Sequence, residues 1–450
     1  MKKKTNKRRQ KNKEIILSGN SVIKFMPLTR VPEPNGKYYI GREDTSTYLH
    51  LISKHAEIIR LCDGKRSLRQ VIELYTSYHG IYSKGKYKEL LEETLVLIEQ
   101  LQGYGFIQSI NDFKLQVDSR IKKETLKSKS AFLKIVFSIQ AMSLYFFILS
   151  VGIALIINNP NKYFPRSKDV FWNPSTSVSL ITFFVVSLIM LFKHELAHLF
   201  SALEFGIKGK IQLSRRMFYL VAETSIEDIY KLPLKKRLII YLSGIASDGV
   251  VLGICMLLMH FVDMGVFSLN ELSILFLKQV VYVSWISILW QFRFFMKTDI
   301  YAIFEDISGC DELLDLAKAK ISYWFYKLTK SLAFSLKIRY LKYKEFCRNE
   351  IFLDAKHVLS WYTMFVFIGV LISIFQFTFY DIPITVTVVK EGVSKVIEGV
   401  QFASSASLFD GIVLLFLQLI YWGLFAYVLL KELFIVGGRK WDEDIFREME

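Results

Sequence analysis

The feature that most constrains the fold of this 450-residue chain is a series of six long apolar segments. Each holds enough mostly apolar residues to cross a bilayer, whose hydrocarbon core requires about 20 in a helix. The segments span about 132–157, 177–203, 238–262, 271–295, 358–379 and 411–436. Because only helices and closed barrels satisfy the backbone within lipid, the pattern predicts a polytopic α-helical membrane protein with about six transmembrane helices.

Basic residues gather at the N-terminus and in the loops between the apolar segments, and they predict the orientation. The chain has 58 Lys and Arg against 42 Asp and Glu. Loops 206–237 and 296–357 are strongly basic, so the positive-inside rule places them in the cytoplasm with both termini and leaves loop 263–270 outside. No nucleic-acid motif follows the basic arm at 1–19. We therefore expect a multi-pass protein of the cell membrane that contacts lipid and binds no nucleic acid.

Residues 20–113 differ from the rest by their mixed polarity, which predicts a small cytoplasmic α+β domain like a winged helix. Strands are expected at 38–40 and 106–107, helices at 55–62, 67–78 and 86–103, and a turn at Asp63-Gly64. Ser67 is expected to cap the second helix.

Charge and hydropathy divide the remainder of the chain. The expected parts are the basic arm 1–19, a linker 114–131, a membrane core 132–310, an amphipathic cytoplasmic or membrane-surface region 311–357, and 358–450 with two transmembrane helices and a tail.

The second apolar segment contains the sequence His194-Glu195-Leu196-Ala197-His198, which predicts a metal site. Residues four apart share one face of a helix, so His194 and His198 can bind one zinc ion. Glu195 cannot join them as a ligand, but a carboxylate there can take a proton from the attacking water. Ionisable groups within a membrane segment are costly unless paired or metal-bound, which favours a functional site over two surface histidines at a helix end.

The same motif carries a resemblance to a known family. With Gly206, the Leu-Ser-Gly sequence at 242–244 and the Lys-Thr-Asp-Ile-Tyr sequence at 297–301, it resembles the site-2 protease family of intramembrane zinc metalloproteases, in its bacterial peptide-metalloprotease branch. The resemblance implies an enzyme with Glu195 as catalytic residue, zinc as cofactor and Asp299 as third zinc ligand.

Two departures from the family pattern leave questions for the structure. Ile300 replaces the glycine of an Asp-Gly-Tyr motif, and Gly244-Ile245 replaces a Gly-Pro. A β-branched residue resists backbone conformations that glycine allows, which puts the local geometry and the activity in question. Orientation favours Asp299, because segments two and four both run toward the cytoplasm, but Asp248 in segment three is the competing ligand.

The N-terminal region carries a second resemblance. The sequence at 58–68, Ile-Ile-Arg-Leu-Cys-Asp-Gly-Lys-Arg-Ser-Leu, and the later 101–107 are similar to PqqD-like domains, which recognise leader peptides of ribosomally made, modified peptides. The resemblance implies that residues 20–113 bind a leader peptide. A generic winged helix that docks another partner is the alternative.

Together these features predict a membrane-embedded zinc endopeptidase that cleaves a peptide near the cytoplasmic leaflet. By resemblance, its role is maturation or export of a modified peptide or bacteriocin, with a leader-peptide substrate and an export transporter as expected partners. The alternative is a non-catalytic membrane protein for peptide export, chaperoning or immunity, in which the metal site is structural or vestigial.

Overall fold

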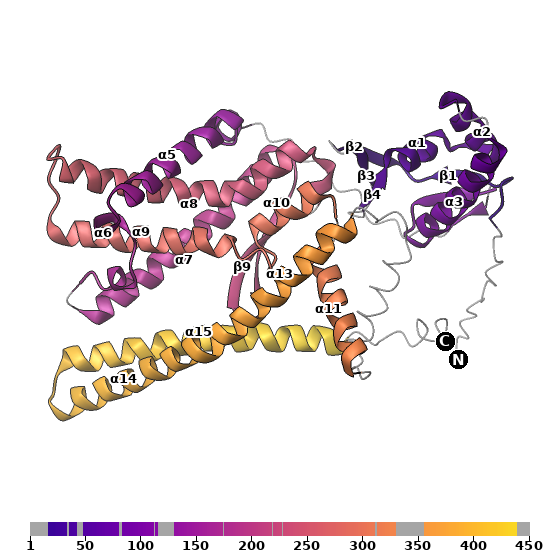
Figure 1. Cartoon of the computed structure of the whole chain (residues 1–450). Coiled ribbons are helices and arrows are strands. Elements are labelled where there is room, and N and C mark those ends of the chain that lie inside the picture. The colour runs from indigo at the N-terminus through magenta and orange to yellow at the C-terminus, as the bar shows by residue number, and fades with distance from the viewer. Residues whose placement is uncertain are drawn as a thin grey trace, which may run out of the picture. The chain divides into compact units, whose positions relative to one another are not determined.

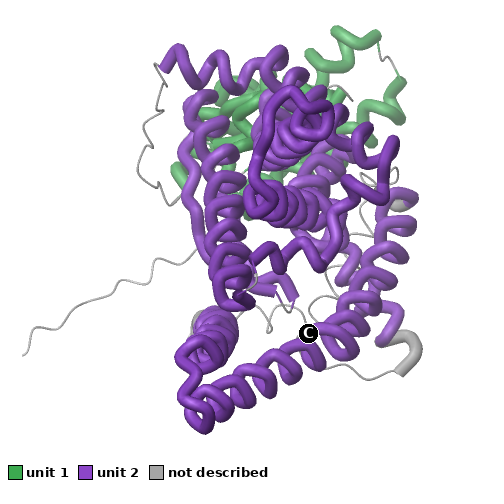
Figure 2. The backbone as a smooth tube through the Cα atoms, turned by 90° about the vertical axis from the view of Figure 1, so that its left-hand side faces the viewer, with its two compact units in different colours: residues 1–125, 228–233 green, residues 126–227, 234–450 purple. Residues whose placement is uncertain are grey.

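The computed structural model divides the chain into two compact units, coloured separately in Figure 2. The first comprises 1–125 and 228–233, and the second comprises 126–227 and 234–450. The structure describes residues 17–33, 36–42, 48–80, 83–111, 113–115, 130–173, 175–217, 219–226, 228–310, 313–329 and 355–438. Most of the basic arm, most of the linker 114–131 and much of region 311–357 lie outside the described residues.

The first unit packs three helices with small antiparallel sheets. Its helices are α1 (Ser53–Leu61), α2 (Leu68–Tyr78) and α3 (Lys84–Gly103). One sheet has the order β5-β1-β6-β7, formed by Asp63–Ser67, Val22–Phe25, Ile107–Ile110 and Phe113–Lys114. The other has the order β2-β3-β4, formed by Leu28–Pro32, Lys37–Arg42 and Tyr48–Ile52.

The expected helices of this unit are confirmed, and the expected turn at 63–64 lies within a strand that was not expected. Ser67 begins α2 with a reciprocal capping box to Gln70, and α2 buries Leu68, Val71 and Ile72 on its inner face. The predicted turn at 63–64 lies at the start of strand β5, where Gly64 has a positive φ of 76° and Asp63 Oδ1 accepts hydrogen bonds from Lys65 N and Arg66 N. The strand pairs with β1 at Asp63 and Ser67, and the register shifts between these two pairs, where the local turn interrupts the ladder.

The first unit also includes a short segment from the middle of the chain, residues 228–233. Its 3-10 turn η2 (Ile229–Lys231) packs against β2 and β3. The Tyr48 hydroxyl donates to Asp228 Oδ1 at 2.9 Å, and the Tyr230 ring stacks on Tyr39 with centroids 4.6 Å apart. Burial, with Asp228 adding to it, raises the pKa of Tyr48, so the phenol keeps its proton and donates.

The second unit is helical. Six helices in the described part of the chain are long and apolar enough to cross a membrane: 139–158, 176–204, 234–263, 271–291, 357–401 and 405–430. The first four are α5 (Ile139–Asn158), α7 (Thr176–Glu204), α8 (Leu234–Asp263) and α9 (Glu271–Gln291). Helix α8 packs against α5, α7 and α9 (Figure 1). The predicted helical membrane architecture agrees with these lengths and compositions.

A β-hairpin and the helix α14 were not expected from the sequence. A hairpin of β8 (Gly209–Arg216) and β9 (Tyr219–Ile226) occupies the segment predicted as a basic loop. Helix α13 (Ala355–Gln376) continues through a π-helical turn (Phe377–Asp381) into α14 (Ile382–Gln401), which packs against α15 (Ser405–Gly438).

Candidate metal centre

Helix α7 presents the two histidines of the motif on one side. His194 and His198 lie one turn apart in a continuous helix, with ring centroids 4.9 Å apart. Both side chains are almost fully buried, with residue exposures of 3% and 6%. Burial of two imidazoles in an apolar helix is costly unless their nitrogens are satisfied, so the partners of each nitrogen decide what the pair can do.

Asp299 meets the two histidines from another part of the chain. It is the first residue of α10 (Asp299–Ser308), and Thr298 caps this helix by accepting a hydrogen bond from Tyr301 N. The backbone N–H of Asp299 donates to Gln291 Oε1 at 3.1 Å. Its Oδ2 lies 3.0 Å from His194 Nε2 and 3.2 Å from His198 Nε2. The three groups could therefore hold one metal ion, their ligand atoms lying within 4.8 Å of one another.

The nearest partner of the outer nitrogen of each ring is an atom that can only accept a hydrogen bond. His194 Nδ1 lies 2.8 Å from Asp248 Oδ2, and His198 Nδ1 lies 2.7 Å from the carbonyl oxygen of Ile240. Each Nδ1 must carry the proton in such a contact, which leaves the Nε2 lone pair of a neutral ring for a cation. Metal-binding histidines commonly have this arrangement, because the outer acceptor fixes the tautomer and the ring orientation.

Asp248 is held behind His194 and does not share the space between the two Nε2 atoms. Besides its contact with His194 Nδ1, the Asp248 carboxylate accepts hydrogen bonds from Lys193 Nζ at 2.7 Å and from Ser287 Oγ at 2.6 Å. Of the two aspartates considered from the sequence, the structure thus places Asp299 at the metal-facing nitrogens. Asp248 instead contacts the outer nitrogen of His194.

The space beside the Nε2 atoms fits a small cation. A side-chain carbon added at Gly244 would lie 2.4 Å from His194 Nε2 and 2.5 Å from His198 Nε2. His198 Nε2 is buried, and its contact with Asp299 Oδ2 at 3.2 Å does not have the geometry of a hydrogen bond; no other described residue supplies one. A buried nitrogen without a hydrogen bond is costly, and a cation bound between this nitrogen and the Asp299 carboxylate would satisfy both groups. Two imidazole nitrogens and one carboxylate oxygen are a ligand set that zinc accepts.

The helix that carries Asp299 is fixed to α8 by a buried ion pair. Arg237 Nε lies 2.6 Å from Asp306 Oδ2, and both residues are buried. Because α8 also carries Gly244, this contact ties the helix of Asp299 to the helix that lies beside the two histidines. Ile300 is the second residue of α10, where the backbone is helical. The position therefore does not require the backbone freedom of glycine, and Ile fits without strain.

The fourth residue of interest, Glu195, is buried and points toward the hairpin. Its Oε2 accepts a hydrogen bond from Thr224 Oγ1 at 2.7 Å. Sequence reasoning did not identify Thr224, because no local pattern connects a strand residue with a helix residue 29 positions earlier. Only the tertiary packing of β9 on α7 brings them together.

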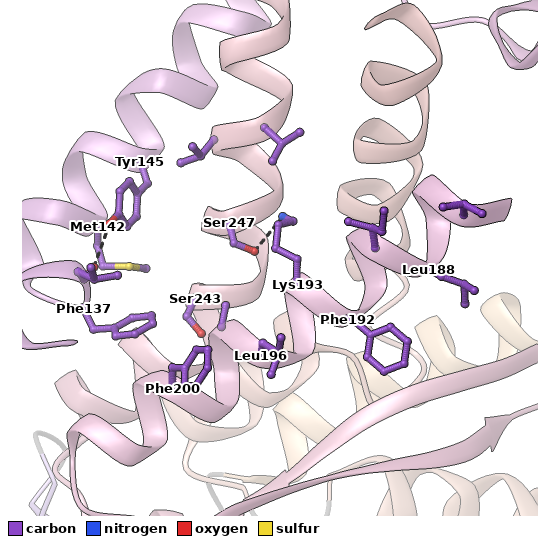
Figure 3. Close-up of a pocket in the computed structure, with 16 residues that line it drawn as sticks. Phe137, Met142, Tyr145, Leu188, Phe192, Lys193, Leu196, Phe200, Ser243 and Ser247 are labelled. Carbon is purple, nitrogen blue, oxygen red and sulfur yellow. Dashed lines mark hydrogen bonds between the residues drawn. The ribbon is translucent and has the colours of Figure 1, made fainter. Parts of the chain in front are cut away.

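A separate apolar cavity of about 870 Å³ lies on another face of α7 (Figure 3). Its walls come from α5, α7, α8 and the short helix α4 (Ala131–Val136). Lys193 and Ser247 meet at its wall, where the ammonium donates to the hydroxyl at 3.1 Å. The metal-facing histidines do not line this cavity. The cavity is therefore distinct from the candidate metal site.

Comparison with known proteins identified no matching protein-family model, curated protein or solved structure. The resemblances to site-2 proteases and PqqD-like domains stay predictions from short motifs. Function is therefore inferred from the residues of the site and their geometry.

Proposed function

We propose that the protein is a membrane-embedded zinc endopeptidase that cleaves a peptide near the cytoplasmic leaflet. The observation that carries the proposal is the convergence of His194, His198 and Asp299 beside Gly244, with Glu195 next in the chain to a ligand. A site of three protein ligands leaves one position for water or substrate, as catalytic zinc sites do, whereas structural sites have four protein ligands.

The roles of the side chains follow from their chemistry. His194, His198 and Asp299 would hold the ion, which when bound polarises the scissile carbonyl and makes water easier to deprotonate. Asp248 and the Ile240 carbonyl orient the two imidazoles. Glu195 takes the proton of the attacking water and passes it to the leaving amine, which is the work of a general base and then a general acid. Comparing peptide hydrolysis by wild type and Glu195→Gln tests the proposal.

The proposed substrate is a ribosomally made peptide, which the protein would cleave during maturation or export of that peptide. The first unit supports peptide capture, because β5 is an edge strand of its sheet. A cavity lined by Leu61, Arg66, Gln70, Leu74 and Tyr78 lies beside this strand. An edge strand can pair with an extended peptide, while a neighbouring cavity receives a side chain. Capture by a tethered domain raises the concentration of the peptide near the site.

The purified protein is expected to bind about one zinc ion per chain, as one three-ligand site would. The double substitution His194→Ala/His198→Ala should release it, because only a single carboxylate ligand remains. Metal analysis after dialysis measures both. The control is His260→Ala, which should keep the zinc. His260 lies outside the cluster, and its Nδ1 is 3.2 Å from the Tyr163 hydroxyl. Undiminished zinc in the double variant would contradict the assigned ligands.

The proposed cytoplasmic location of the site predicts which loops can be labelled from outside. In a background without native cysteines, Lys210→Cys in the 206–237 loop should resist a membrane-impermeant maleimide in intact cells. Ser268→Cys, in the loop between α8 and α9, should react. Both side chains are exposed in the structure, so accessibility is set by the membrane. External labelling at 210 with protection at 268 would place the site at the opposite leaflet.

A further inference from the structure

The hairpin β8–β9 makes a direct contact with the proposed proton acceptor. Thr224 Oγ1 donates to Glu195 Oε2 at 2.7 Å and also lies 3.0 Å from the backbone carbonyl oxygen of Glu195. A hydroxyl has one proton, and a charged carboxylate is a stronger acceptor than a carbonyl. The contact therefore holds one oxygen of the Glu195 side chain and restricts its rotation.

The close approach of the hairpin to α7 depends on a residue without a side chain. Gly209 pairs with Ile226 at the end of the hairpin. A carbon added at Gly209 would lie 2.9 Å from Leu199 Cδ1 and 3.3 Å from Thr224 Cγ2. Side chains alternate along a strand, so Thr224 and its neighbour Ser225 point to opposite faces, and Ser225 is exposed. Thr224 thus points toward α7 and Glu195.

We propose that Thr224 is a positioning residue for hydrolysis, which fixes the Glu195 carboxylate so that its second oxygen can take the proton of the attacking water. The proposal rests on the proposed function of the site. A general base must stay within hydrogen-bond reach of the proton, and fixing its orientation removes conformations that cannot react. Because Thr224 acts through Glu195, its loss should matter only while Glu195 is a carboxylate.

The test compares Thr224→Val, Thr224→Ser and Ser225→Val in the full-length, zinc-loaded protein. Valine has the shape of threonine without the hydroxyl, serine keeps the hydroxyl, and Ser225→Val places the same residue on the opposite face of the strand. The probe is acetohydroxamic acid, a zinc ligand whose hydroxyl proton is taken up by a neighbouring carboxylate. Its dissociation constant is measured by calorimetry, together with the zinc content of each variant.

We expect Thr224→Val to weaken hydroxamate binding by about tenfold, as for loss of one hydrogen bond to a charged group. Thr224→Ser and Ser225→Val should bind like wild type, and all variants should keep their zinc. In the Glu195→Gln background, Thr224→Val should add no further loss, because the two residues act as one unit. A purely structural role would add its effect in both backgrounds.

Two outcomes would overturn the inference while leaving the proposed function intact. One is hydroxamate binding by Thr224→Val equal to that of wild type. The other is an effect of Thr224→Val that persists in full in the Glu195→Gln background. If the wild-type protein held no zinc or bound no hydroxamate, the proposed function would fail, and the role of Thr224 with it.

Discussion

Replacement of Gly244 by alanine is expected to remove the metal from the protein. The added methyl group would lie 2.4 Å from His194 Nε2 and 2.5 Å from His198 Nε2. Zinc binds imidazole nitrogen at about 2.0–2.1 Å, so the methyl group would occupy the place of the ion. Substitution of residues that only orient ligands lowers metal affinity by about 10–100-fold. We expect a loss of about 100-fold or more from a methyl group within the ligand sphere.

A matched control separates this effect from a general response of membrane helices to alanine. Gly423 lies in α15, where an added side-chain carbon would meet no atom of the described residues within 4 Å. Gly423→Ala should keep its zinc, because alanine fits there and favours a helix. Metal content and competition with a zinc indicator measure both variants. Wild-type zinc affinity in Gly244→Ala would show that the ion does not bind between the two Nε2 atoms.

Replacement of Glu195 by glutamine is expected to lower peptide hydrolysis by about 10²–10⁴-fold, the usual contribution of a general base. Glutamine keeps the size of the side chain, and its amide oxygen can still accept the hydrogen bond from Thr224. It cannot take the proton of water. Zinc content should stay at the wild-type level, because Glu195 is not among the ligands.

Glu204 supplies the matched control for this substitution. It is the last residue of α7 and lies outside the metal cluster. Glu204→Gln removes the same charge from the same helix and should hydrolyse peptide like wild type. Equal loss in both variants would assign the effect to the stability of α7 and not to proton transfer.

The sequence predicted the parts of this molecule that depend on local pattern. Long apolar segments indicate membrane helices because the bilayer requires a fixed length, and Ser67 indicates the start of α2 because a cap acts within one turn. The spacing of His194 and His198 predicts their common face for the same reason. Asp299 came from a short motif and the orientation of two helices, and the structure brings it to both rings.

The parts that were not predicted depend on contacts between distant residues. The hairpin in segment 206–237 was not predicted, and Thr224 was not identified because its partner Glu195 lies 29 positions earlier in the chain. Asp248 was a possible ligand until its position behind His194, 54 residues away, was known. Charged residues in α14, such as Lys390 and Glu391, lowered its hydropathy. Helix α14 packs against α15, and sequence alone does not show that contact.

The most direct test of the central claim is mass spectrometry of peptides incubated in heavy-oxygen water with membranes that contain wild-type protein or Glu195→Gln. Small peptides encoded beside this chain's gene are the first substrates to use. Hydrolysis places an oxygen atom from water in each new C-terminal carboxylate. We predict a cleaved, labelled peptide with wild type and none with Glu195→Gln at equal zinc content. Identical products from both membranes would contradict the account and favour a non-catalytic protein with a structural metal site.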